Sequence, residues 1–475
     1  MLQESKTRPF WLLTLTAMMI LVVSQLIQDG AFMDGMLYVS VSKNLADGIG
    51  TFWDPHFCIS YQSSFHEQPP LYFGLLALFY KVFGGSMYVE RLFCFCCFLL
   101  TGFYIHKLWR KIFFADPAIA RNSWLPVLYW TIIPICFWAY TNMVEEVVMS
   151  LFVVIAVYHS FIALFLEKRV ILNLVLSGIF IFLAFFTKGI QGIFPVIAAG
   201  AFWLIRKNYI FKTMLLHSLL LVGIPLLIYF MTVTLSADAH TSFDKYFGNR
   251  LVGTFSNRND TTDTHFFLLG RLITHLLPIA AISFLLRLIF RKYKATVRNE
   301  RNSDVIKWLL LLGFSGSLPL LITLEQRSFY LVTSMPFFAL SIAVWAAPQV
   351  SAALSFADAG SKRYKAFALI TVLLLAASVG FSALQAGKAK RDAGTLQDVY
   401  AFGKLLGHGE IVTVPSRMDY EFSFKEYMIR YFYINTVSAE RHYFICKKDT
   451  PPEFIPAAYT RYPIETKEFD LYIKK

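Results

Sequence analysis

Ten polar or ionisable side chains stand near the ends of long apolar runs, and their types suit proton transfer and anion binding. They are Asp34, Tyr38, His66, Glu67, Gln68, Glu145, Glu146, Lys188, Arg327 and Tyr330. A carboxylate can accept the proton of an attacking hydroxyl group, which makes it a general base. A lysine or arginine forms strong charge-assisted hydrogen bonds to phosphate. Such a set predicts a site for a substrate with an anionic head and a hydrocarbon tail.

The acids and the tyrosine also have plainer interpretations. Asp34 precedes an amphipathic segment, where an acid suits a helix N-cap, and Tyr38 suits an aromatic anchor at a membrane interface. Glu145 and Glu146 suit the end of one helix and the start of the next. The residues alone leave these alternatives open.

The cations and the histidine segment are equally open to two interpretations. Lys188 and Arg327 have side chains long enough to reach lipid headgroups from within a membrane. His66 and Glu67 precede two prolines, in a position that suits an ordinary solvated turn. The placement of these residues relative to the membrane is needed to choose between the interpretations.

The composition is that of a membrane protein. Of the 475 residues, 56% are hydrophobic and 16% are charged, whereas soluble globular proteins have about 25% charged residues. Apolar runs of about 18 residues or more recur along most of the chain, and each can cross ~30 Å of hydrocarbon as a helix. The fold class predicted is an all-α polytopic membrane protein with a small soluble α/β region.

The net charge of +13 is distributed in a way that fits this class. Basic residues lie in short loops between apolar runs, at 107–111, 167–169, 206–212, 291–301 and 362–365. Basic loops of this kind stay on the cytoplasmic side and contact anionic lipid headgroups. The distribution favours a membrane protein over a nucleic-acid-binding protein.

About eleven spans are predicted, with the N-terminus inside and the C-terminus outside. They lie near residues 10–27, 88–108, 124–141, 146–166, 170–187, 189–205, 213–235, 265–290, 305–324, 328–347 and 364–384. Residues 69–83 are excluded, because a helix of this length reaches only about 22 Å and two prolines open the run. This segment is predicted to be a juxtamembrane helix.

Two domains follow from this topology. Residues 1–384 form the membrane domain, in which residues 28–87 are a long external loop with two surface helices and residues 236–264 are a second, polar loop. Residues 385–475 form a small external α/β domain. Its strands are predicted at 410–415, 441–448 and 469–475, and its helices at 395–407 and 423–433.

The topology brings polar residues from separate loops to one face of the membrane. The external ends of the spans carry Asp34, residues 65–71, Glu145, Glu146, Lys188, Glu325, Arg327 and Tyr330. An ionisable group within the hydrocarbon costs roughly 2.5–3.5 kcal/mol, so such groups belong at interfaces or in cavities. We therefore predict that these side chains converge in one crevice open to the extracytoplasmic side. Polyprenyl-phosphate sugars and phospholipids both fit such a crevice.

Six segments, in order along the chain, resemble the GT-C membrane glycosyltransferases. They are "MDGMLYVSVSKNLADGIGTF" (33–52), "FHEQPPLYF" (65–73), "YVERLF" (88–93), "YTNMVEE" (140–146), "AFFTKGIQGIFPV" (184–196) and "EQRSFYLVTSMPFFAL" (325–340). Within that class the chain is most similar to the protein O-mannosyltransferases and the lipid A aminoarabinose transferases. The resemblance extends from the first span to about residue 345.

The resemblance implies roles for the acids. Asp34, with Tyr38 four residues later, corresponds to the family acid of the first external loop, a catalytic base or a group that orients the acceptor. Many members have a second acid beside it; Gly35 stands there in this chain, so no paired-acid role is carried over. Glu146, with Glu145 as its neighbour, corresponds to the family acid of the next loop.

The resemblance also implies contacts to the donor phosphate. Lys188 corresponds to the lysine of the family's "TKG" turn, and Arg327 with Tyr330 corresponds to a cation and tyrosine pair before a proline-containing run. Gln68 stands where some lipid A enzymes have a lysine before the first proline, so this loop lacks that cation.

The reaction implied is an inverting transfer from a polyprenyl-phosphate sugar to a lipid, glycan or protein acceptor. Asp34 would act on the nucleophile, and the cations would stabilise the leaving phosphate. No cofactor is required by this scheme. His66, Glu67, Glu146 and Asp34 could supply ligands to a divalent metal, but their spacing is not that of a metal site.

The expected location is a bacterial cytoplasmic (inner) membrane, with the site and the C-terminal domain facing the periplasm. The main alternative is a transporter or flippase of lipid-linked glycans. Transporters place their sites near the middle of the membrane on broken helices, whereas here the charged residues are predicted at one rim. This difference favours the transferase.

Overall fold

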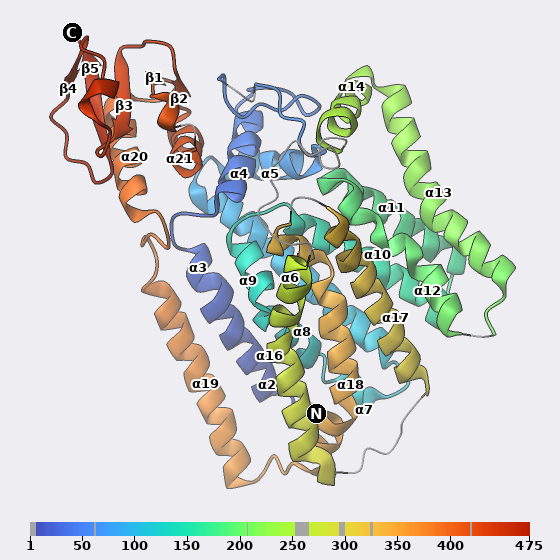
Figure 1. Cartoon of the computed structure of the whole chain (residues 1–475). Helices are drawn as coiled ribbons and strands as arrows, with labels where there is room; N and C mark the ends of the chain where they lie inside the picture. Colours follow the sequence, from blue (N-terminus) through green and yellow to red (C-terminus); the bar gives the residue numbers. More distant parts are fainter. Residues whose placement is uncertain are drawn as a thin grey trace.

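The computed structural model describes residues 6–60, 63–206, 208–251, 266–293, 300–323, 326–418 and 420–475, without the side chains of residues 249–251. Long helices form a bundle that carries a small five-stranded sheet at one end (Figure 1). We name that end, where residues 28–87 and 385–475 lie, the head end. Glu325 and part of the predicted loop 236–264 lie outside the described residues.

Nine helices in the described part of the chain are long and apolar enough to cross a membrane. They are α2 (Arg8–Met18) continued by η1 (Met19–Val23) and α3 (Ser24–Leu26), α6 (Met87–Ile112), α10 (Glu146–Leu166), α11 (Val170–Lys188), α13 (Phe211–Leu235), α16 (Phe267–Ile289) with η4 (Phe290–Lys292), α17 (Glu300–Ser317) with η5 (Leu318–Ile322), α18 (Met335–Phe356) and α19 (Lys362–Ala383). Most of α10 is buried at the centre of the bundle, whereas α13 and α19 expose most of their apolar residues, as lipid-facing helices do. The prediction of a polytopic helical membrane protein is confirmed.

The predicted count of eleven spans is higher than the structure supports, and two segments explain the difference. Residues 124–141 form α8 (Trp124–Ile132) and α9 (Pro134–Thr141), which meet at a bend of 73° and raise the count to ten only if taken as one span. Residues 190–205 form the 3₁₀ helix η2 (Ile190–Ile197) and the short helix α12 (Ala198–Ile205). A proline interrupts the α-helix in both places, because Pro134 and Pro195 lack the N–H that forms the helical hydrogen bond.

Residues between the first two long helices build the surface layer of the head end. They form α4 (Met33–Ala46) and α5 (Leu71–Phe83), which pack against each other. The segment 69–83 was predicted not to cross the membrane, and α5, with 13 residues, is indeed a short apolar helix of about 20 Å. Short elements complete the bundle: α7 (Pro117–Ala120), α14 (Ala237–Lys245), the π-helical η3 (Tyr246–Leu251) and the 3₁₀ helix η6 (Ser328–Thr333).

The C-terminal region contains a mixed sheet with strand order β2-β1-β3-β5-β4. The strands are β1 (Ile411–Thr413), β2 (Asn435–Val437), β3 (Tyr443–Lys447), β4 (Tyr459–Arg461) and β5 (Phe469–Lys474), and β1 runs parallel to β2 and β3 while β5 runs antiparallel to β3 and β4. The helices are α20 (Ala393–Leu406) and α21 (Phe422–Phe432), with the short turns η7 (Ser416–Met418) and η8 (Pro452–Phe454). The three predicted strands and two predicted helices are all present; β2 and β4, three residues each, were not predicted.

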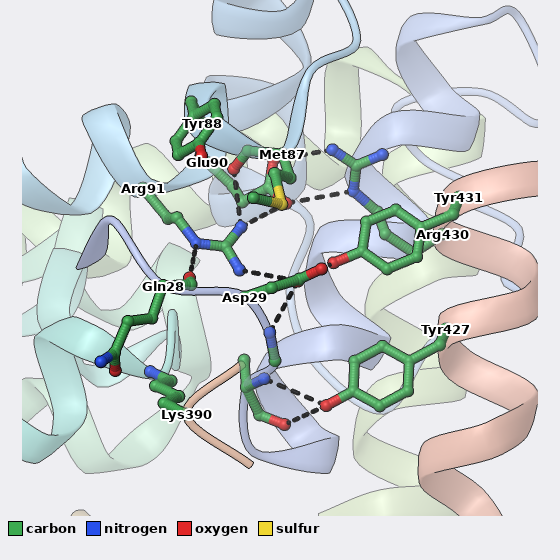
Figure 2. A network of polar contacts seen from close by, with 12 residues as sticks. Gln28, Asp29, Met87, Tyr88, Glu90, Arg91, Lys390, Tyr427, Arg430 and Tyr431 are labelled. Atoms are coloured by element: carbon green, nitrogen blue, oxygen red, sulfur yellow. Dashed lines mark hydrogen bonds and ion pairs between the residues drawn. The ribbon is translucent and has the colours of Figure 1, made fainter. Parts of the chain in front are cut away.

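A buried ion-pair network holds this region to the bundle (Figure 2). Arg430 of α21 places Nη2 2.7 Å from Oε2 of Glu90, which lies in the first turn of α6. Tyr80 donates a hydrogen bond to the same oxygen at 2.8 Å, and Arg91 lies 3.3 Å from Oε1. Both oxygens of the buried Glu90 carboxylate therefore have donors.

Asp29 forms the second half of the network. Its Oδ1 accepts hydrogen bonds from the Gly30 N–H and the Tyr431 hydroxyl, each at 2.6 Å, and lies 3.5 Å from Nη2 of Arg91. Its Oδ2 accepts from the Tyr400 hydroxyl at 2.6 Å. Because Tyr400 and Tyr431 belong to α20 and α21, the network ties both C-terminal helices to the bundle and fixes α21 against α4.

Candidate active site

Three charged side chains from two neighbouring spans meet inside the head end. Nζ of Lys188, at the end of α11, lies 2.8 Å from Oε1 of Glu146 and 3.6 Å from Oε2 of Glu145. Both glutamates are 0% exposed and Lys188 is 7% exposed. Lys188 thus faces one oxygen of each glutamate, whereas Oε1 of Glu145 and Oε2 of Glu146 have no hydrogen bond to the described residues. Buried oxygens in this state are able to accept hydrogen bonds from a ligand.

Aromatic rings from two other segments enclose the lysine. Nζ of Lys188 lies 5.4 Å from the ring centre of Tyr38, 5.7 Å from that of Phe329 and 5.6 Å from that of Tyr330. These distances are in the range of cation–π contacts. Residues of α4, the loop before α10, the end of α11 and η6 thus form one cluster, as the sequence predicts. We name Tyr38, Glu145, Glu146, Lys188 and Tyr330 the central cluster.

Asp34 lies beside the central cluster, in the first turn of α4. Its carboxylate is half-buried and interacts electrostatically with Glu145, Glu146 and Tyr38. The interpretation as the N-cap is wrong, since Phe32 occupies that position. An acid in the first turn still benefits from the positive end of the helix dipole, which stabilises its ionised form.

Hydrogen bonds hold α4 and α5 against the loop that carries Glu145 and precedes Glu146. The N–H of Phe32 donates to the side-chain oxygen of Asn142 at 2.9 Å, and the Tyr72 hydroxyl donates to the carbonyl of Met143 at 2.7 Å. Met143 has a left-handed backbone, with φ of 56°, which is uncommon for a residue with a side chain. This turn lies just before Glu145 and orients the side chains of both glutamates toward Lys188.

Gly35 shows why only one acid stands at the start of α4. A Cβ atom at this position would lie 1.7 Å from the carbonyl oxygen of Asn142, so no side chain fits there without moving the backbone. A second acid beside Asp34 is therefore sterically excluded in this arrangement.

A similar close approach shapes the lysine turn. Gly189 has φ of 89°, and a Cβ atom there would lie 1.7 Å from the Tyr246 hydroxyl oxygen. Two residues later, the Gln191 side chain donates to the carbonyl of Tyr330, which joins this turn to η6. Arg327 immediately precedes η6 and is partly buried, which places its backbone next to the central cluster.

The predicted residues of the 65–71 segment fall in a different environment. Nε2 of His66 lies 2.8 Å from Oδ1 of Asp54 and 3.4 Å from Nζ of Lys245, and its Nδ1 lies 3.2 Å from Oγ of Ser242. His66 therefore joins the first loop to α14. Glu67 is partly buried.

Gln68 is buried just before α5. The roles predicted for His66, Glu67 and Gln68 stay predictions. Among the described residues, no group of three or more His, Cys, Asp or Glu side chains is arranged to hold a metal ion.

Burial alters the acid–base properties of the groups outside the spans. Desolvation raises the pKa of the Tyr38 hydroxyl well above its ordinary value, and the carboxylates of Glu145 and Asp34 raise it further. Desolvation also raises the pKa of Glu145 well above its ordinary value, and the ammonium of Lys188 opposes this effect. Tyr38 is therefore a hydrogen-bond donor at neutral pH, and Asp34 is the more exposed acid.

Sequence reasoning missed residues that reach this area from the C-terminal region. Arg391 places its guanidinium 5.7 Å from the ring centre of Phe32, and Glu426 of α21 interacts electrostatically with Asp34. Nothing in the residues around position 426 signals this contact, because it depends on how α21 docks on α4. Phe329 was also missed, although it stands inside a segment that sequence analysis singled out.

Comparisons with known proteins agree with this description. Residues 67–234 match the family model described as "Dolichyl-phosphate-mannose-protein mannosyltransferase". No curated protein sequence matches the chain. The structure is similar to that of ArnT from Cupriavidus metallidurans bound to undecaprenyl phosphate, with a TM-score of 0.66 at 14% identity, covering 97% of each chain.

A second solved structure is more distantly similar. It is the archaeal oligosaccharyltransferase AglB from Archaeoglobus fulgidus, in complex with an inhibitory peptide and a dolichol-phosphate. Its TM-score is 0.52 at 13% identity, with 90% of this chain and 65% of that chain covered. The resemblance to GT-C membrane glycosyltransferases is confirmed: the chain has their fold, and its segment 67–234 has the sequence pattern of the mannosyltransferase family model.

Proposed function

We propose that the protein transfers a sugar from a polyprenyl-phosphate donor to an acceptor on the extracytoplasmic side of a bacterial inner membrane. The observation that carries this proposal is the convergence of Asp34 with the central cluster at one end of the bundle. The family match over residues 67–234 supports a transferase, and the similar structures of ArnT with undecaprenyl phosphate and AglB with a dolichol-phosphate support the donor class.

The orientation of the protein in the membrane is proposed from the distribution of its basic residues. The start of α2, where Lys6 and Arg8 stand, and the start of α19, which holds the basic residues of 362–365, lie away from the head end (Figure 1). Residues 167–169 join the ends of α10 and α11 that are opposite to Glu146 and Lys188. Because basic loops stay on the cytoplasmic side, the head end would face the periplasm. Donor and acceptor would meet there.

In the proposed reaction Asp34 is the general base. The acceptor oxygen attacks the anomeric carbon as its proton passes to the Asp34 carboxylate, and the bond between that carbon and the phosphate oxygen breaks with inversion. Polyprenyl phosphate leaves with the electron pair. Protons, charge and bonds balance without a cofactor, and a positioned base contributes typically 10²–10⁴-fold to such a step.

We assign the remaining roles in the reaction from the charges of the residues in the site. Glu145 and Glu146 already balance the charge on Lys188, so we assign Arg327 and Tyr330 as the main contacts to the donor phosphate. Lys188 holds the two glutamates in place and offsets their negative charge beside the phosphate. The two carboxylate oxygens that do not face Lys188, Oε1 of Glu145 and Oε2 of Glu146, then accept hydrogen bonds from hydroxyl groups of the sugar.

The test is sugar release by the purified full-length protein in detergent. Labelled undecaprenyl-phosphate sugars are supplied as a panel, with an extract of bacterial envelope as the source of acceptor, and free undecaprenyl phosphate is measured. Asp34→Asn should lower release by about 10²–10⁴-fold. The control Asp47→Asn, at the other end of the same helix and paired with Lys43, should leave it unchanged.

Two results would overturn the proposal. One is equal release by wild type and Asp34→Asn. The other is no release from any donor, combined with movement of intact lipid-linked sugar across liposomes, which would favour the transporter alternative.

A further inference from the structure

A polar cavity lies at the end of the bundle opposite to the head end. It is partly open and lies between the start of α2, the turn from α7 to α8 and the last turns of α18 (Figure 1). Six of its eight lining residues are polar or charged: Lys6, Thr7, Arg121, Asn122, Ser351 and Ser355. Because α2 starts and α18 ends here, and both are long enough to cross a membrane, the cavity lies at the membrane surface.

The lining of the cavity carries positive charge. Lys6 and Arg121 contribute one charge each, and no acid stands among the described residues that line the cavity. The Lys6 ammonium donates to the carbonyl of Ser355 at 3.2 Å, which uses one of its three N–H groups and leaves two for a ligand. The Tyr364 hydroxyl donates to the Lys6 carbonyl at 2.8 Å and so ties this residue to α19. A cavity with this charge favours an anion.

The size of the cavity and its surroundings indicate which anion fits. Its volume is about 40 Å³, which is room for about three ordered water molecules at about 10–15 Å³ each. The two charged oxygens of a phosphodiester can take the place of such waters. Phe356, directly after Ser355, is 69% exposed and stacks on Tyr293 with 5.2 Å between ring centres. Exposed aromatic rings are typical of the level of lipid headgroups. These features together fit a ligand with a phosphate head and apolar tails.

We propose that this cavity binds the phosphate group of an anionic phospholipid. Lys6 and Arg121 supply the positive charge, and Thr7, Asn122 and Ser351 supply the polar groups around it. Basic pockets between spanning helices on the cytoplasmic side of a membrane bind anionic headgroups in this way. The lipid would hold the first span against α18. The side of the membrane rests on the orientation proposed above, but the binding itself does not.

The experiment is a titration of the purified, delipidated full-length protein with phosphatidylglycerol in an uncharged detergent. Native mass spectrometry measures the bound lipid, and phosphatidylcholine and inorganic phosphate form two further arms. The double variant Lys6→Gln with Arg121→Gln removes both cations of the cavity. The matched control, Lys168→Gln with Arg169→Gln, removes the same residue types and charge from the exposed turn between α10 and α11. A third variant, Ser351→Leu, fills the cavity without changing its charge.

We expect the wild type to bind phosphatidylglycerol more tightly than phosphatidylcholine. The cavity double variant should weaken this binding about 30-fold, since one basic residue at a charged membrane surface contributes about fivefold. Ser351→Leu should weaken it as well, and the control should keep it. Equal weakening in the cavity and control variants would show that surface charge alone attracts the lipid, and would overturn the proposal. Inorganic phosphate that binds as tightly as the lipid would assign the cavity to a soluble anion and overturn it too. Sugar transfer is not measured, so failure of this site and failure of the proposed function are separate outcomes.

Discussion

The head end contains two buried clusters of charged residues that differ in one physical respect. In the network of Asp29, Glu90, Arg91 and Arg430, every carboxylate oxygen has at least one donor. In the central cluster, Lys188 pairs with one oxygen of each glutamate, and Oε1 of Glu145 and Oε2 of Glu146 have no hydrogen bond to the described residues. Burying polar atoms without partners costs roughly 1–3 kcal/mol each. The comparison indicates that the first cluster is built for holding the fold and the second for holding a ligand.

The largest effect is expected from breaking the satisfied network. Arg430→Met leaves the buried Glu90 carboxylate without its best partner, and breaking one side of a buried pair costs about 3–5 kcal/mol. The thermal unfolding midpoint in detergent should therefore fall strongly. The control Arg461→Met, which breaks an exposed pair with Asp470, should cost less than about 1 kcal/mol. Equal unfolding midpoints for the two variants would show that the pair of Glu90 and Arg430 does not stabilise the protein.

Removing the cation of the central cluster should lower the transfer rate as well as the stability. Lys188→Met leaves the negative charge of the two glutamates uncompensated beside the proposed phosphate site, and losing one such preorganised group costs about 10²–10³-fold in rate. Sugar release should fall by that factor, and the unfolding midpoint should fall too, because two buried carboxylates lose their counter-charge. Lys81→Met, on the exposed side of α5, is the control. A variant that loses stability but keeps its transfer rate would reverse the assignment of the two clusters.

The contact that joins α4 to the glutamate loop can be tested by adding one methyl group. Gly35→Ala would place Cβ against the carbonyl oxygen of Asn142, and such overpacking costs typically about 1–3 kcal/mol. A lower unfolding midpoint and slower transfer are both expected, because Asp34 moves with the helix. Gly223→Ala has open space around its new Cβ and should be neutral or slightly stabilising. Identical behaviour of the two variants would show that α4 is not held at this point.

The smallest effect should come from Glu145→Gln, and it depends on pH. Because burial raises the pKa of Glu145 above its ordinary 4.5, the folded protein binds this proton more tightly than the unfolded chain. The stabilisation is present below about pH 4.5 and is lost as pH rises toward the folded pKa. Unfolding midpoints from pH 4.5 to 8 should decline less in Glu145→Gln than in wild type; a steeper decline would contradict this.

Sequence patterns predicted the members of the central cluster but not its charge balance. The types and order of Tyr38, Glu146, Lys188 and Tyr330 were sufficient to predict that these residues converge. The reason is that alternating spans bring the ends of successive helices to one face of the membrane. The pairing of Lys188 with both glutamates was not foreseen, since it depends on the left-handed turn at Met143. The same holds for His66, which a loop conformation directs toward α14.

Span counting erred where hydropathy and backbone chemistry disagree. Residues 189–205 are apolar enough to be predicted as a span, but Gly189 and Pro195 end and distort the helix. Hydropathy measures only the preference for lipid and does not report a missing N–H. The C-terminal strands β2 and β4 were missed for a related reason, since three-residue strands are too short to show alternation.

By itself the sequence determined the class of the protein, because apolar length, basic loops and the order of six segments depend only on local composition and spacing. Only the tertiary structure decided which charges are paired and which stay open to a ligand. It also decided that α21, nearly four hundred residues after α4, packs against it. Such contacts depend on the docking of α21 through Arg430 and Glu90, and long-range packing leaves no periodic trace in the chain.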